Sequence, residues 1–170
     1  DNGYQIVFIA KNKKGYENLS KMSSIAYTQG FYYVPRIDKK IVEEYKSDLM
    51  VLTGNLNGEV PSKILNVGDN QAEEALQWWK SQFGEDLYIE LMRHQQEDEK
   101  RANQVLIQLA QKHGVKLLAT NNSYHTSKAE ANAHDILLCV KEGEKQATPI
   151  GRGRGFRFGL PNQEYYFKSQ

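Results

Sequence analysis

The sequence is poor in cysteine, in long apolar runs and in charge of one sign. Its single cysteine, Cys139, excludes an internal disulfide, so we expect a reducing, cytoplasmic location. No apolar run approaches the roughly 20 residues that a membrane-spanning helix needs. The 22 Lys and Arg nearly balance the 21 Asp and Glu, so the net charge of +1 gives no global argument for binding to nucleic acid or a membrane. A basic and apolar leader is also missing, and we expect the abrupt start to be a cut within a longer protein.

The composition that remains is typical of a folded domain. The chain has 170 residues, of which 39% are hydrophobic, 25% charged and 11% aromatic. These values lie near the average for globular proteins, and the length suits one compact domain with a core of its own.

Apolar periodicity predicts strands that alternate with helices. Short β-branched or apolar runs predict strands at residues 5–10, 49–53, 87–91, 115–120 and 165–167. Repeats of three and four residues predict helices at 15–27, 38–45, 59–67, 71–83, 96–113 and 128–140. Residues 143–159 read as an irregular loop. Because such alternation builds βαβ units, we expect an α/β fold with mostly parallel strands and flanking helices.

Residues that directly follow predicted strands are unusually neutral. In parallel sheets and barrels, ligands collect at the carboxyl ends of strands, which here bear Asn55 after one strand and Asn122, Tyr124 and His125 after another. Amides at such places often make turn hydrogen bonds only. The four histidines show no metal-binding spacing, so His125 is a weak candidate ligand and no more.

A glycine- and arginine-rich loop is the remaining motif. Residues 151–158 interleave Arg152, Arg154 and Arg157 with aromatic residues, a pattern found in contacts to single-stranded nucleic acid. A solvated surface loop explains the same composition. No phosphate-binding loop, nucleophile elbow or dinucleotide fingerprint occurs in the sequence, so no catalytic residue is assigned.

Several separated blocks resemble, in order, the PHP (polymerase and histidinol phosphatase) domain of bacterial DNA polymerase III α subunits. They are residues 9–12, 15–19, 26–38, 53–59, 88–91, 118–122, 133–139 and 166–169. The resemblance implies a partial PHP-type distorted (β/α)7 barrel. Residues 1–170 would form the C-terminal part of a single PHP domain whose earlier strands lie upstream, and residues 143–170 would form a loop and strand leading toward the polymerase core.

The resemblance also implies that the metal site of the family is degenerate in this chain. The family's histidine, cysteine and aspartate–histidine pair match Gln5, Asn55, Asn122 and Tyr124, which are amides and a phenol. Such side chains lack the charge and donor strength of a multinuclear site, so we expect no metal and no cofactor here. Magnesium is implied only for the polymerase core.

Two classes of function follow from these observations. The first is a non-catalytic structural and interaction module of a DNA-directed DNA polymerase, a nucleotidyltransferase. Its implied partners are the rest of the α subunit, the proofreading exonuclease subunit and, through the full-length protein, DNA. The alternative is a metal-dependent phosphoesterase or proofreading nuclease. A free-standing nucleic-acid-binding domain rests on the arginine loop alone. We also expect residues 5–10 to lie at an exposed parallel edge that favours self-association.

Overall fold

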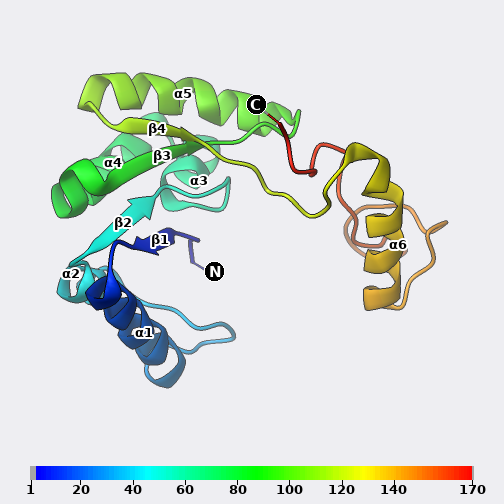
Figure 1. The fold of residues 1–170 in the computed structure, drawn as a ribbon. Helices are drawn as coiled ribbons and strands as arrows, with labels where there is room; N and C mark the ends of the chain where they lie inside the picture. Colours follow the sequence, from blue (N-terminus) through cyan, green and yellow to red (C-terminus); the bar gives the residue numbers. More distant parts are fainter. Residues whose placement is uncertain (1–2, 170) are drawn as a thin grey trace. The chain divides into compact units, whose positions relative to one another are not determined.

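A computed structural model describes residues 3–169 of the chain, which form two compact units (Figure 1). The first unit runs to Leu91 and includes Glu97–Ala119, and the second combines Met92–Gln96 with the residues from Thr120 onwards. The sequence predicted one compact domain. The division arises because a short segment from the middle of the chain is bonded to the C-terminal part, as in the hydrogen bond from Asn162 Nδ2 to the His94 carbonyl (2.6 Å).

The first unit is built on a four-stranded sheet in which the strand order follows the chain. The strands are β1 (Val7–Ala10), β2 (Leu49–Leu52), β3 (Leu87–Leu91) and β4 (Lys116–Ala119). The pairs β2–β3 and β3–β4 are parallel, which confirms the predicted α/β class with a mostly parallel sheet.

Strand β1 departs from the prediction because it runs antiparallel to β2. The chain leaves β1 through α1 (Lys13–Thr28) and returns through α2 (Lys39–Tyr45). It enters β2 beside the point where β1 ended, as the hydrogen bond from Lys11 N to the Asp48 carbonyl shows (2.9 Å). Two helices, rather than one crossover helix, therefore reverse the strand direction. As expected, β1 lies at an edge of the sheet, but the edge is antiparallel and not parallel.

The helices begin and end close to the predicted residues. Besides α1 and α2 they are α3 (Glu59–Asn66), α4 (Asp69–Phe83), α5 (Glu97–His113) and α6 (Ala131–Glu142), with 3-10 turns η1 (Gly84–Asp86) and η2 (Lys128–Glu130). Side-chain caps explain two of the starts, because Asn12 Oδ1 accepts from Gly15 N and Asp38 Oδ1 accepts from Ile41 N, both at 3.0 Å. None of the helices among the described residues is long and apolar enough to cross a membrane.

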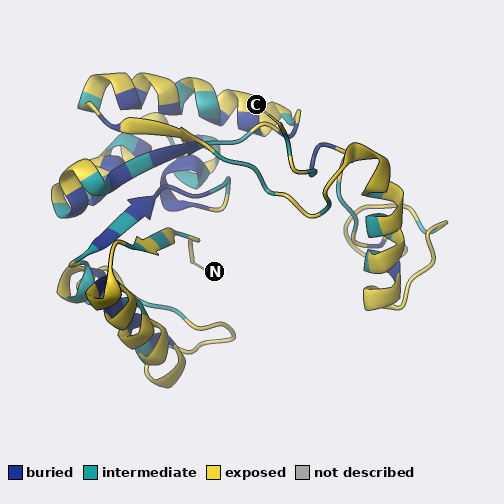
Figure 2. Ribbon diagram, viewed as in Figure 1, coloured by how far each residue is buried: buried dark blue, intermediate teal, exposed yellow. Residues whose placement is uncertain are grey.

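The core of the first unit lies between the sheet and its helices. Fully buried residues on β2, β3, α3, α4 and α5 form it, including Val51, Ile89, Ile64, Leu76 and Leu106. Phe8 of β1 adds its ring to those of Trp79 and Phe83 on α4. All four residues of β4, by contrast, are exposed (Figure 2).

The second unit contains α6 and irregular loops. The strand predicted at residues 165–167 is wrong, since Tyr166 forms only an isolated bridge with His125. The backbone of Tyr165 and Phe167 is bonded to residues 124 and 125, which are themselves loop, so no ladder extends from the bridge. The predicted irregular loop after Gly143 is confirmed.

Candidate functional site

The degenerate positions in the first unit make local hydrogen bonds. The backbone N–H of Gln5 donates to the Asn57 carbonyl (2.9 Å), and Asn55 Oδ1 accepts from the backbone N–H of Asn57 (2.9 Å). The segments of Gln5 and Asn55 lie side by side, because a Cβ on Gly54 would stand 3.3 Å from the Gln5 carbonyl oxygen. The Asn55 amide oxygen therefore makes the kind of turn hydrogen bond expected of an amide that follows a strand.

In the second unit, Asn122 and Tyr124 are bonded to each other. The Asn122 amide nitrogen donates to the Tyr124 hydroxyl, and its backbone N–H donates to His94 Nε2, both at 3.3 Å. His94 is buried and its ring stacks on Tyr165, with centroids 4.3 Å apart. A role for His94 could not be predicted, because nothing in the spacing of residues 94 and 122 signals the contact.

His125 is the most ligand-like residue of this unit. Its Nδ1–H donates to the Ser127 carbonyl (2.8 Å), which leaves Nε2 as the acceptor nitrogen. That Nε2 is buried and accepts no hydrogen bond from the described residues. The ring lies 5.7 Å from that of His134, and both line a small cavity of about 230 Å³. Within residues 3–169, however, no three His, Cys, Asp or Glu side chains come together as a metal site.

The three arginines of the glycine-rich loop differ in their surroundings. Arg152 and Arg154 are exposed, as a nucleic-acid contact requires. Arg157 is buried, and its guanidinium binds both carboxylate oxygens of Asp135 at 2.7 and 2.9 Å. The hydrogen bonds from Arg157 lower the pKa of Asp135. Burial acts in the opposite direction but is the weaker effect, so this pKa lies below its ordinary value. The structure therefore gives Arg157 a structural role and does not support the predicted nucleic-acid contact.

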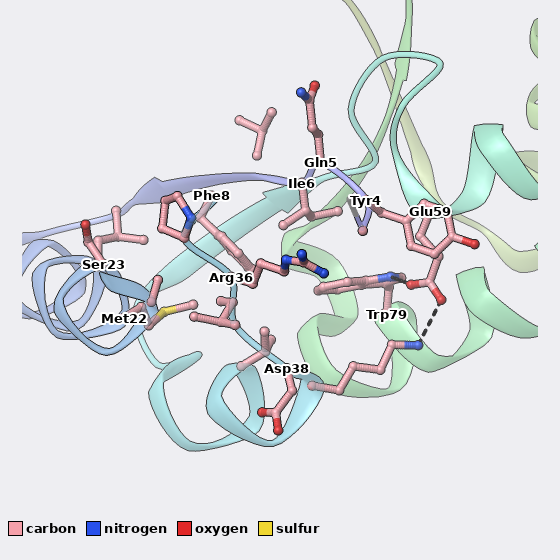
Figure 3. Close-up of a pocket in the computed structure, with 18 residues that line it drawn as sticks. Tyr4, Gln5, Ile6, Phe8, Met22, Ser23, Arg36, Asp38, Glu59 and Trp79 are labelled. Atoms are coloured by element: carbon pink, nitrogen blue, oxygen red, sulfur yellow. Dashed lines mark hydrogen bonds and ion pairs between the residues drawn. The ribbon is translucent and has the colours of Figure 1, made fainter. Parts of the chain in front are cut away.

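A cavity of about 810 Å³ in the first unit was not foreseen. It lies among side chains of β1, α1, α2 and α4, and Figure 3 shows Glu59 and Trp79 at one end with Met22 and Ser23 at the other. Glu59 is buried and accepts hydrogen bonds from Trp79 Nε1 (2.9 Å), Lys63 and Lys39 (both 3.0 Å).

The charge of Glu59 is fully compensated by these donors. Burial alone would raise the pKa of Glu59, but the bonds from Trp79, Lys63 and Lys39 outweigh it and hold that pKa below the ordinary value. Because several donors hold Glu59 as an anion, it is a poor candidate for a general acid.

Comparison with known proteins identifies the family. The pattern of the PHP domain matches residues 1–94, more than half of the chain. The chain belongs to the PHP domain family. Its relatives named DNA polymerase III subunit alpha include those of Borreliella burgdorferi (36% identical over 98% of this chain and 14% of that protein) and Thermus aquaticus (36%, 99% and 13%). That of Aquifex aeolicus is 38% identical over 96% of this chain and 14% of its own length.

These relatives confirm the resemblance deduced from the sequence blocks. The match extends over almost the entire chain, beyond the 94 residues that the PHP pattern covers. The chain spans about one seventh of the length of the curated relatives it matches.

Proposed function

We propose that this PHP domain acts as a non-catalytic structural and interaction module of a bacterial DNA polymerase III α subunit. The observation that supports the proposal is the contrast between a sequence match over nearly the whole chain and neutral side chains at each degenerate ligand position. The fold has been retained while the chemistry of the site has changed.

The residues present do not fit the metal cluster implied by the family. Multinuclear phosphoryl chemistry needs anionic or imidazole donors that are free to bind cations. Here Asn55 Oδ1 is used in a turn and the Tyr124 hydroxyl accepts from Asn122, and both groups are neutral. Of the candidate ligand positions, His125 keeps an available nitrogen, and one histidine rarely suffices to hold a metal.

The proposal assigns the polymerase reaction and its magnesium to other parts of the α subunit. This domain would contribute surfaces for the rest of that subunit and for the proofreading exonuclease subunit. Exposed β1 and β4 edges supply unpaired backbone groups for such contacts, as edge strands commonly do. The role is therefore in DNA replication, through assembly of the replicative enzyme.

A chimaera tests the proposal directly. The 170 residues would replace the matching segment of the Thermus aquaticus α subunit, and primer extension would be compared with that of the parent and of a subunit lacking the segment. We expect the chimaera to keep extension within about an order of magnitude of the parent and the deletion to lose it. A soluble deletion variant with full activity would contradict the proposal.

The alternative, a metal-dependent phosphoesterase, is supported only by the buried, unpartnered Nε2 of His125. Hydrolysis of a phosphodiester by the purified chain, abolished by a chelator and by His125→Ala, would favour it over the module.

A further inference from the structure

Charge is distributed unevenly along the chain. The segment of residues 11–40 holds seven Lys and Arg against two Asp and Glu, a local net charge of +5, whereas the whole chain has +1. Among the described residues, four of these lysines form no ion pair: Lys13, Lys14, Lys21 and Lys40. The segment therefore carries a local excess of positive charge on a nearly neutral protein.

The same segment exposes five aromatic side chains: Tyr16 and, further along the chain, a group of four here called the aromatic surface, which consists of Tyr27, Phe31, Tyr32 and Tyr33. Tyr27 lies in the last turn of α1, and the others of this group lie in the loop that leads to α2, most of which Figure 2 shows as exposed. The rings form two pairs, Tyr27 with Phe31 (6.4 Å, nearly parallel) and Tyr32 with Tyr33 (4.7 Å, edge to face). Exposed aromatic clusters of this kind mark interaction sites.

Contacts at Tyr32 and a tight turn at Gly30 shape the loop that carries these rings. The Tyr32 carbonyl accepts a hydrogen bond from Arg36 (2.6 Å), whose guanidinium also lies 5.0 Å from the Tyr32 ring centroid. The backbone N–H of Tyr32 donates to the Val34 carbonyl (3.1 Å). Gly30 permits the tight turn, because a Cβ there would come within 1.9 Å of the Arg36 carbonyl oxygen.

Tyr33 is the most informative residue of the surface. Its φ of 61° lies in the left-handed region that favours glycine, yet its side chain is 80% exposed. Burial cannot be what fixes the ring in this strained conformation. Strained residues cluster at ligand-binding sites, where the strain presents a side chain to a partner.

We propose that the aromatic surface and its lysines bind single-stranded DNA. Flat exposed rings stack on unpaired bases and lysines neutralise phosphates, which is how sequence-tolerant single-strand sites are built. A second copy of the chain fits poorly, since a symmetric contact would bring two segments of charge +5 together. The choice of DNA over RNA rests on the proposed role in replication.

Fluorescence anisotropy of a labelled oligothymidylate of about 20 nucleotides, titrated with the whole chain at about 50 mM salt, tests the proposal. We expect binding in the micromolar range, weakened at least about tenfold by Phe31→Ala combined with Tyr33→Gly. Glycine suits the positive φ of residue 33, so that substitution does not strain the loop. Lys21→Ala combined with Lys40→Ala should lower the salt dependence of binding as well as the affinity.

Two control variants separate this surface from general effects. Phe167→Ala removes a 76% exposed ring from the second unit, and Lys145→Ala removes an exposed charge there. Neither should change the affinity by more than about twofold. The fluorescence of Trp78 and Trp79 reports whether the first unit of each variant is folded, and protection of the buried Cys139 from a thiol reagent reports the second unit.

Several results would overturn the proposal. They are no binding up to about 100 µM chain, equal weakening by the control variants, or tighter binding of duplex DNA or oligouridylate. Self-association that the Phe31 and Tyr33 variant abolishes would assign the surface to a second copy instead. Primer extension by the chimaera is a separate readout, so failure of the module role is distinguishable from failure here.

Discussion

Replacing Asp135 by asparagine keeps the shape of the side chain and removes the charge that neutralises Arg157. The pair is well enclosed, because the side chains of Arg157 and Asp135 are only 4% and 22% exposed. The guanidinium also donates to the carbonyls of Thr148 (2.8 Å) and Gln146 (3.3 Å). It therefore joins α6 to the loop that follows it.

The size of the effect follows from the loss of a buried partner. Breaking a buried ion pair costs about 3–5 kcal/mol, because the remaining charge is left uncompensated. Asp135 is partly exposed, and Arg157 keeps its hydrogen bonds to backbone carbonyls. The expected loss of stability for Asp135→Asn is therefore smaller, about 2–3 kcal/mol. The opening equilibrium of the second unit should then rise by a factor of about 30–150.

The positions of one cysteine and two tryptophans supply an assay for each unit. Cys139, the only cysteine, is buried on α6, so its labelling by a thiol reagent under native conditions measures opening of the second unit. Trp78 and Trp79 report the first unit. We expect Asp135→Asn to raise the labelling rate by the stated factor and to leave the denaturation midpoint seen by tryptophan fluorescence unchanged.

The matched control is Glu142→Gln on the same helix, which removes an exposed carboxylate 3.7 Å from Lys141. Surface pairs contribute about 0–1 kcal/mol, so its labelling rate should change by less than about fivefold. Equal rates for the two variants would refute the reasoning.

The effect of Asp135→Asn on the labelling rate should also depend on pH. Arg157 lowers the pKa of Asp135, so the pair contributes stability above the unfolded carboxyl pKa of about 3.9 and loses it as pH falls through the folded pKa. The difference in labelling rate between wild type and Asp135→Asn should therefore be full at neutral pH and disappear in acid. A pyridyl disulfide, which reacts in acid, allows the measurement. A difference that stays constant down to about pH 2 would contradict the assignment.

Three further predictions concern the metal site, the sheet edge and the strained tyrosine. Elemental analysis of the purified chain should find no stoichiometric zinc, manganese or iron, and an activity assay should find no metal-dependent hydrolysis of a phosphodiester. Near-unit metal occupancy that is lost in His125→Ala would contradict this prediction. Sedimentation measured over a range of protein concentrations should show self-association, which Val7→Lys combined with Ile9→Lys should reduce. These β1 side chains are 40% and 42% exposed at an open sheet edge. A wild-type chain that stays monomeric at all concentrations would contradict this prediction. Tyr33→Gly should raise the free energy of unfolding of the first unit by up to about 1 kcal/mol, because it relieves the strain of the left-handed backbone. The unfolding transition followed by tryptophan fluorescence measures this. A clear decrease in that free energy would show that the ring contributes to stability.

Features encoded by neighbouring residues could be predicted from the sequence. The start of α2 follows from Asp38, whose side chain accepts a hydrogen bond from the backbone three residues on, whereas α1 begins two residues before its predicted start because Asn12 caps it. The turn at Asn55 follows from the same short-range chemistry.

Features that depend on distant partners could not be predicted in this way. An apolar run indicates a strand but contains no information on its direction, so the antiparallel β1 was missed. The composition of residues 151–158 could not show that Arg157 is buried against Asp135, which lies 22 residues earlier in the chain. The aromatic run at 165–167 has strand propensity but lacks a neighbouring strand to pair with.

The match between strand order and chain order has a consequence for biosynthesis. Each pairing in the sheet joins strands that are consecutive in the chain, so no strand depends on a partner beyond the next strand to be synthesised. All residues of the first unit precede Thr120, whereas the second unit needs bonds such as that from Lys168 Nζ to the Arg93 carbonyl (2.7 Å). On the ribosome, the sheet can therefore be complete before residues 92–96 can form their bonds. Their partners lie about 70 residues further along the chain and are synthesised later.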